Sequence, residues 1–160
     1  MAVTVSRRRA LIGSIGLAST VFADRLMASV AKLPTAESLP QELKQALATG
    51  NPLVVMVSLE GCPFCKVARE NYLIPLQTRQ GLPVVQVDMR SKSSLKTFQE
   101  TTTTHDEWIR AAGIKVAPTL IFFGRGGVEV AERMNGGYIP DFYGAYLDER
   151  LKLAKSRINA

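Results

Sequence analysis

The sequence predicts an α/β fold in which helices cover both faces of one mixed β-sheet. Two observations support this prediction. Short apolar runs rich in β-branched residues alternate with longer segments whose apolar residues recur at helical spacing. Near the C-terminal end, two apolar runs are separated only by a glycine-rich turn, which predicts an antiparallel hairpin. The 160 residues suffice for one domain with a sizeable core.

Residues 1–31 have the pattern of a secretory signal segment that precedes this fold. Three arginines at positions 7–9 form a positively charged start, and an apolar stretch from Ala10 to Ala23 follows. That stretch is shorter than a membrane-spanning helix requires. We expect cleavage of the signal peptide after Ala23 or after Ala31.

The export route follows from the same segment. Ser6 to Leu11 resembles a twin-arginine export signal. Export by the general secretory route and an uncleaved anchor are the alternatives. In each case residues 32–160 form the folded domain, and we expect it to lie in the periplasm, where disulfide chemistry is permitted.

The charge of the chain does not predict a nucleic-acid partner. The net charge is +6, and residues 1–31 account for half of it, with four arginines against one aspartate. The remaining positive charge is not clustered with aromatic residues, as it would be in a nucleic-acid interface.

Nothing in the sequence pattern predicts an obligate interface with another chain, so we expect a monomer.

The first helix and strand are expected after a linker over residues 32–37. Ser38 and Gln41 have the spacing of a capping box that opens a helix ending near Thr49. The apolar face of this helix would be formed by Leu39, Leu43, Ala46 and Leu47. A turn at residues 50–52 then leads into an apolar strand over residues 53–59.

A second helix and strand follow. Residues 67–76 are expected to be helical, with Pro75 kinking or ending the helix. A turn at residues 79–81 precedes a strand over residues 82–88. Residues 89–103 are polar and are expected to form an irregular insertion with a helical turn around residues 95–99.

The C-terminal half is expected to contain a helix, a hairpin and a final helix. Thr104 and Glu107 have capping-box spacing at the start of a helix that Gly113 ends. Strands are expected over residues 118–123 and 128–133, and a helix over residues 140–156. The last helix has apolar residues at helical spacing, namely Phe142, Tyr143, Tyr146, Leu147 and Leu151.

The two cysteines of the chain, Cys62 and Cys65, lie between the first strand and the following helix. Unpaired N–H groups and the positive end of the helix dipole stabilise a thiolate at a helix start. Pro63 suits the first helical position, where a missing N–H is tolerated. We therefore expect Cys62 to be the exposed attacking thiol and Cys65 the buried resolving thiol of a redox pair.

Three other functions of the pair remain open. A structural disulfide is one, although so short a loop restrains the unfolded chain little. A zinc site is another, but the pair and His105 supply fewer than the usual four ligands. The third is a copper(I)-binding carrier or scaffold, with Met89 and Met134 as further sulfurs. No resident metal or cofactor is expected for the redox function.

The chain resembles the thioredoxin superfamily over roughly residues 36–156. The resemblance rests on the motif Cys62–Cys65, on Val116 to Thr119 some 50 residues later, and on the glycine-rich hairpin. It implies a thioredoxin fold and a cis peptide bond between Ala117 and Pro118. It also implies that Pro63, Phe64, Ala117, Pro118 and Thr119 shape the substrate-binding surface, with the Ala117 backbone pairing with a bound segment.

The resemblance has departures at the site. Thioredoxin carries a tryptophan before its first cysteine and a buried acid on the preceding strand, whereas Gly61 and Met56 occupy these positions here. Met56 cannot transfer a proton. Glu60 could do so through water, or it could be a solvated loop charge. His105 could be read as a base, but a histidine beside a helix start is usually a surface residue, and we expect that here.

The export segment, the cysteine motif and the ending Tyr143–Leu151 are similar to small periplasmic thioredoxins, including those associated with bacterial sulfur oxidation. This similarity implies a thiol:disulfide oxidoreductase that acts on protein substrates, with reduction as the expected direction. Because the periplasm is kept oxidising, a reductase there would need a membrane thiol electron donor.

Overall fold

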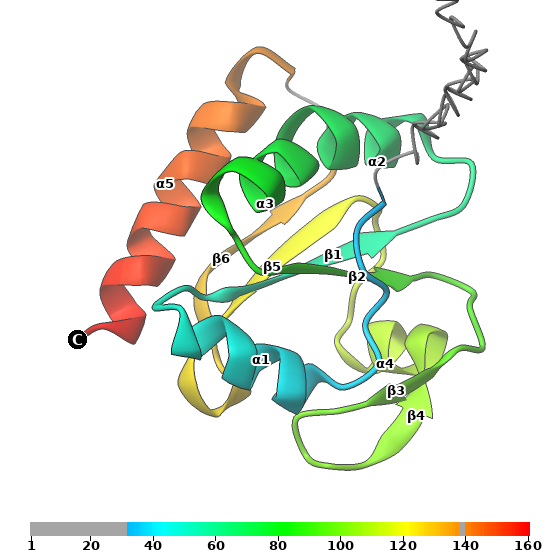
Figure 1. Cartoon of the computed structure of the whole chain (residues 1–160). Helices are drawn as coiled ribbons and strands as arrows, with labels where there is room; N and C mark the ends of the chain where they lie inside the picture. Colours follow the sequence, from blue (N-terminus) through cyan, green and yellow to red (C-terminus); the bar gives the residue numbers. More distant parts are fainter. Residues whose placement is uncertain (1–31, 138–139) are drawn as a thin grey trace, which may run out of the picture.

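The computed structural model describes residues 32–137 and 140–160, and it shows a four-stranded sheet (Figure 1). The strand order is β2 (Val84–Asp88), β1 (Leu53–Ser58), β5 (Thr119–Phe123) and β6 (Glu129–Asn135). β1 pairs in parallel with β2, whereas the β1–β5 and β5–β6 pairs are antiparallel. The predicted mixed sheet is therefore confirmed. The export segment and its cleavage sites lie outside the described residues.

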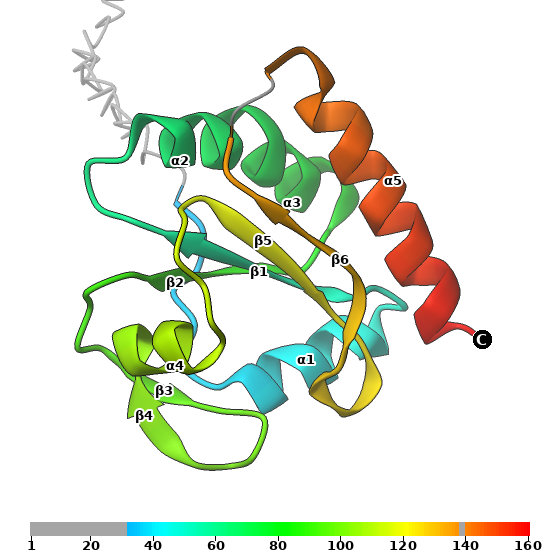
Figure 2. The same cartoon turned by 180° about the vertical axis from the view of Figure 1, so that it is seen from behind.

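Helices cover both faces of this sheet, as Figures 1 and 2 show. One face packs against α1 (Leu39–Ala48) and α4 (His105–Ala111). The other packs against α5 (Pro140–Ile158) and one continuous helical segment, which consists of α2 (Pro63–Val67), η1 (Ala68–Leu73) and α3 (Ile74–Gln80). Among the described residues, no helix combines the length and the apolar character needed to cross a membrane.

β1 is the central strand and every one of its residues is buried. Val54 and Met56 point into the core beneath the α2–α3 segment, while Val55 and Val57 point into the core beneath α1. A strand covered on both faces is apolar throughout, which is why the sequence shows an unbroken apolar run here. β1 leads directly to the cysteine pair.

The start of the domain differs from the sequence prediction in two ways. Residues 32–37 are not a free linker, because Pro34 and Ala36 exchange backbone hydrogen bonds with Gln86 of β2, at 2.7 and 2.8 Å. The Ser38–Gln41 capping box is also absent, since the Ser38 side chain makes no capping hydrogen bond. Instead the Glu42 carboxylate accepts hydrogen bonds from the backbone N–H groups of Glu37 and Ser38.

Pro75 does not end its helix, which runs on to Gln80. The turn before it is widened to a π-helix, so that the Ile74 N–H bonds to the Arg69 carbonyl five residues back. Pro75 then falls in the first turn of a new α-helical register, where its missing N–H is tolerated. Gly81, in the left-handed conformation at φ 64°, caps the helix.

The insertion after β2 is a second, two-stranded sheet and not a helical turn. β3 (Ser94–Lys96) pairs antiparallel with β4 (Thr102–Thr104). Leu95 is fully buried in the core beneath α4, and the β-branched threonines of β4 suit a strand. The capping box of Thr104 and Glu107 at the start of α4 is confirmed.

The hairpin β5–β6 turns through η2 (Arg125–Gly127). Gly127 has φ 71°, and a Cβ there would lie 2.5 Å from the Phe98 ring, so only glycine fits. α5 closes the second face with Tyr143, Leu147 and Leu151 buried, as its spacing predicts. Phe142 and Tyr146 lie outside that stripe and are exposed.

Candidate active site

Cys62 stands at the start of the helical segment, directly after the loop that leaves β1. It is the N-cap residue of α2, and its Sγ accepts a hydrogen bond of 3.2 Å from the Cys65 N–H. The side chain is half-buried and both cysteines are free thiols. The structure therefore gives Cys62 an accessible sulfur that accepts a backbone hydrogen bond.

Cys65 lies one helical turn further in and is fully buried. Burial, together with the neighbouring Cys62, raises the pKa of its thiol to about 11. Hydrogen bonding from the Leu59 backbone and from the Ser58 side chain acts in the opposite direction on this pKa. With this raised pKa, Cys65 is protonated at neutral pH.

The segment before β5 closes the site from the other side. The Ala117–Pro118 peptide bond is cis, and the Cys62 thiol donates to the Ala117 carbonyl at 3.8 Å. Pro118 is buried. Thr119 is also buried, and its hydroxyl bonds to the Val116 carbonyl at 2.7 Å. Cys62 and Ala117, 55 positions apart in sequence, are therefore in contact.

Exposed apolar side chains surround the accessible sulfur. Phe64, two positions after Cys62, is 52% exposed, and Val116, next to Ala117, is 51% exposed. Gly137 packs so closely on this surface that a Cβ there would lie 3.1 Å from Phe64 Cβ and 3.5 Å from Pro118 Cγ. The sequence predictions placed Pro63, Phe64 and Pro118 at the site but missed Val116 and Gly137 as parts of its surface.

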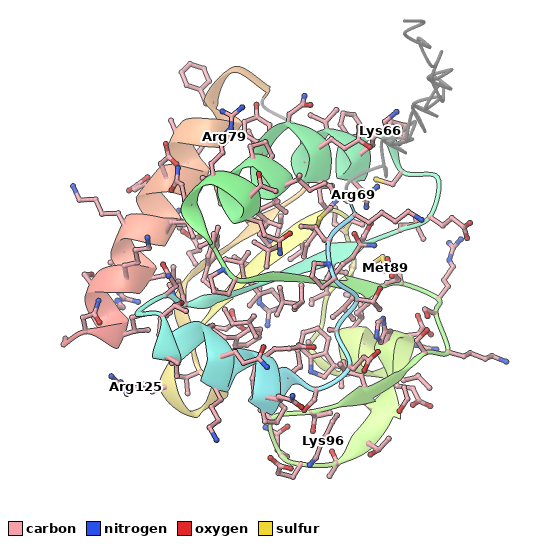
Figure 3. All side chains as sticks on the ribbon, viewed as in Figure 1. Lys66, Arg69, Arg79, Met89, Lys96 and Arg125 are labelled. Carbon is pink, nitrogen blue, oxygen red and sulfur yellow. The ribbon has the colours of Figure 1, made fainter. Side chains whose placement is uncertain are left out.

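A polar groove of about 990 Å³ opens on the opposite side of Cys62. The ends of β1 and β2 and the first turns of the helical segment line it, and Figure 3 shows Lys66, Arg69 and Met89 around it. Arg69 Nη1 donates to Gln86 Oε1 at 2.8 Å, and Gln86 Nε2 donates to Asp88 Oδ1 at 2.7 Å. This hydrogen-bonded row was not predicted from the sequence.

In the part of the chain that the structure describes, none of the groups that shift the pKa of Cys65 is an acidic side chain. Met56 of β1 is fully buried in the same core cluster as Cys65. Glu60 is exposed in the loop and lines the groove. The polar residue of β1 nearest the pair in sequence is Ser58, which is 1% exposed and also lines the groove.

The prediction that His105 is a surface residue is wrong. His105 is fully buried beneath the opposite face of the sheet. Its Nδ1 accepts a hydrogen bond from the Asp88 N–H at 3.0 Å, and its Nε2 donates to the Ala36 carbonyl at 2.9 Å. Two backbone partners from distant segments account for this burial, and they give His105 a structural role.

Within residues 32–137 and 140–160, no group of three or more His, Cys, Asp or Glu side chains could hold a metal ion. Met89 packs against the α1 side of the core and Met134 against the α5 side, so the structure does not bring these sulfurs together with each other.

Comparison with solved structures finds the same fold. The structure is similar to reduced Schistosoma mansoni thioredoxin pre-protein, with 20% identity, coverage of 76% of this chain and 97% of that one, and a TM-score of 0.50. Fasciola hepatica thioredoxin is 16% identical, with 75% and 97% coverage and a TM-score of 0.50. At such identities the likeness indicates the fold alone.

A periplasmic thioredoxin is also among the similar structures. SoxS from Paracoccus pantotrophus, in its reduced form, is 19% identical, with coverage of 64% of this chain and 98% of that one, and a TM-score of 0.44. That score is too low to support an argument about function. No curated protein matches the chain in sequence.

A protein-family comparison gives the assignment directly. The family described as thioredoxin-like domain matches residues 39–150, which include both cysteines, Pro118 and all four strands of the central sheet. A cysteine pair at a helix start, in contact with the Ala117 carbonyl, is consistent with thiol:disulfide exchange. The chain belongs to the thioredoxin-like domain family.

Proposed function

We propose that this protein is a periplasmic thiol:disulfide oxidoreductase that reduces disulfides in protein substrates through Cys62 and Cys65. The observation that carries the proposal is the asymmetry of the pair. Cys62 is accessible and accepts an N–H hydrogen bond on its sulfur, whereas Cys65 is buried and protonated. An exchange reaction in two steps needs this difference, because one thiol must attack first and the other must wait.

The reaction runs in two balanced steps. The Cys62 thiolate attacks one sulfur of the substrate disulfide, a mixed disulfide forms, and the other substrate sulfur leaves as a thiolate. Cys65 then loses its proton and attacks Cys62 Sγ, which releases the second substrate thiolate and leaves a Cys62–Cys65 disulfide. The substrate gains two electrons and the cysteine pair loses them.

The apolar surface around Cys62 supports a protein substrate. Phe64 and Val116 expose apolar area on the two segments that meet at the Cys62–Ala117 contact, which suits an extended peptide segment better than a small polar thiol. The backbone of Ala117 is the proposed partner for that segment, with Pro63, Pro118 and Thr119 shaping the surface around it.

The proposed direction and location follow from the motif and the export segment. Phe64 adds no positive charge beside Cys62. A motif with such a charge strongly stabilises the reduced pair, and the protein that carries it is therefore an oxidant. A reductase in the periplasm must itself be reduced, so the proposed partner is a membrane thiol electron donor. The export segment over residues 1–31, whose pattern resembles a twin-arginine signal, supports the location.

Replacement of Cys65 by serine is expected to trap this reaction at its first step. Without the resolving thiol, Cys65→Ser should accumulate mixed disulfides between Cys62 and substrate proteins. The measurement is the appearance of higher-mass species on non-reducing gels after incubation with a disulfide protein, and their disappearance on addition of a reductant.

The double variant Cys62→Ser/Cys65→Ser is the matched control and should trap nothing. If Cys65→Ser trapped nothing either, thiol exchange would be contradicted. Stoichiometric binding of copper(I) by the reduced wild-type protein would then favour the copper carrier that the same cysteine pair allows.

A further inference from the structure

The resolving step requires a negative charge on a buried sulfur. Cys65 must become a thiolate, yet it is fully buried and the strand beneath it carries Met56 where an acid could have taken its proton. An isolated buried thiolate is unfavourable because burial penalises the charged form. Some group of this chain must therefore stabilise the negative sulfur.

Ser58 is the polar side chain of β1 on the correct face. Side chains alternate along a strand, so Ser58 shares the face of Val54 and Met56, which lie in the same core cluster as Cys65. Ser58 is 1% exposed and ends β1, four residues before Cys62. It lines the groove, and its side chain hydrogen-bonds to Cys65.

Arg69 determines which way the Ser58 proton points. Arg69 Nη1 donates to Ser58 Oγ at 3.5 Å, so the oxygen acts as acceptor toward the groove. The hydroxyl proton is then available to another acceptor, and the hydrogen bond between the Ser58 side chain and Cys65 lowers the pKa of that thiol. Arg69 is itself held by Gln86 Oε1 at 2.8 Å, and Gln86 is held by Asp88, so the guanidinium has a fixed place.

We propose that the Ser58 hydroxyl, oriented by Arg69, donates the hydrogen bond that stabilises the Cys65 thiolate during resolution of the mixed disulfide. Arg69 is the positioning residue, and its positive charge behind the hydroxyl strengthens the bond. This assignment rests on the proposed exchange function. In this arrangement, the Ser58 hydroxyl with the Arg69 cation behind it serves Cys65 as a hydrogen-bond donor. It takes the place of the proton acceptor that an acidic side chain would provide.

The step balances in atoms and electrons. The Cys65 S–H proton passes to water in the groove, and the Ser58 O–H bonds to the sulfur that remains. A Cys65–Cys62 sulfur bond forms as the bond from Cys62 to the substrate sulfur breaks, and the departing thiolate takes a proton from solvent. The titratable groups that act on or near Cys65 are Cys62 at the start of α2 and Tyr143 on α5. The groove that Ser58 and Arg69 line also contains the charged residues Glu60, Lys66, Glu70, Asp88 and Arg90.

A reaction with excess of the aromatic disulfide DTNB separates the two cysteines in time. Attack by Cys62 releases the first aromatic thiolate at a rate proportional to reagent concentration. Attack by Cys65 releases the second at a rate independent of that concentration. Stopped-flow absorbance follows both phases across neutral and alkaline pH, so the pH profile of the second phase reports the Cys65 thiolate directly.

Ser58→Ala is expected to slow the second phase about tenfold at neutral pH, because a hydrogen bond to a charged group is lost. The pH profile of that phase should also move to higher pH. Ser58→Thr keeps the hydroxyl and should remain within about threefold of wild type. Arg69→Gln should slow the second phase severalfold. Ser156→Ala, an exposed serine on α5, is the control and should change neither phase.

An unchanged second phase in both Ser58→Ala and Arg69→Gln would overturn the assignment. Equal slowing of both phases would also overturn it, because that result would indicate general damage to the site. The proposed function fails in a different way, namely if the wild-type protein releases one thiolate only or lacks a concentration-independent phase. Because Arg69→Gln leaves β1 intact, it tests the assignment even if Ser58→Ala does not fold.

Discussion

Replacement of Cys62 by serine is expected to lower the disulfide reductase activity by about three orders of magnitude, to near the uncatalysed rate. The reason is that Cys62 is the accessible sulfur, with the Cys65 N–H at 3.2 Å and the Ala117 carbonyl at 3.8 Å. Cys65 cannot substitute for it, because it is fully buried and its pKa is raised to about 11. The measurement is the rate of insulin disulfide reduction with dithiothreitol as electron donor.

The two single variants should differ in a way that identifies the order of attack. Cys62→Ser should neither reduce insulin nor form a mixed disulfide with it, whereas Cys65→Ser should still form one. Thermal unfolding of each variant shows whether the fold is kept. Substantial reduction by Cys62→Ser, or mixed disulfides formed through Cys65, would contradict the assigned roles.

Replacement of His105 by alanine is expected to lower the free energy of unfolding by about 3–5 kcal/mol while leaving the exchange rate unchanged. The imidazole is fully buried and pairs with the Asp88 N–H and the Ala36 carbonyl. Its loss leaves a cavity and two backbone groups without their partner. It lies on the α1 and α4 face of the sheet, away from the cysteines. Urea denaturation measures the effect.

His105→Phe separates the two contributions. Phenylalanine fills most of the space but pairs with neither backbone group, so this variant should remain destabilised by about 2 kcal/mol or more. Full recovery of stability in His105→Phe would show that the hydrogen bonds contribute little. A fall in the exchange rate of folded His105→Ala would instead indicate a catalytic role.

The sequence predicted the central features of the fold because they are local. The apolar run of β1, the helix start at Cys62 and the capping box of Thr104 each depend on residues close together in the chain. The β5–β6 hairpin likewise follows from its glycine-rich turn. These patterns position the cysteine pair at the end of a buried strand without any long-range information.

The errors concern contacts between distant segments. His105 is buried because Ala36, 69 positions earlier, supplies its second hydrogen bond. Leu95 forms part of a strand because β4 pairs with β3, although its neighbours in sequence are polar. The partners of these two residues could not be identified from local spacing. Pro75 is a separate case, because it lies within a helix whose hydrogen-bond register is reset locally by the π-turn before it.

The same limit applied to the site. Cys62 and Cys65 follow from their spacing, but the row of Ser58, Arg69, Gln86 and Asp88 comes from β1, η1 and β2 and exists only in the folded chain. The signal that could have revealed it is weak: a serine closes an otherwise apolar strand, and β2 carries two polar residues among its valines.

The redox potential of the Cys62–Cys65 couple tests the central claim most directly. The protein is equilibrated with glutathione or dithiothreitol buffers, and the fraction of reduced pair is measured by thiol labelling. The account predicts a reversible two-electron couple at about −270 to −230 mV, in the range of thiol reductants. A potential near about −120 mV would contradict the proposed direction. The absence of any reversible couple would contradict thiol:disulfide exchange itself.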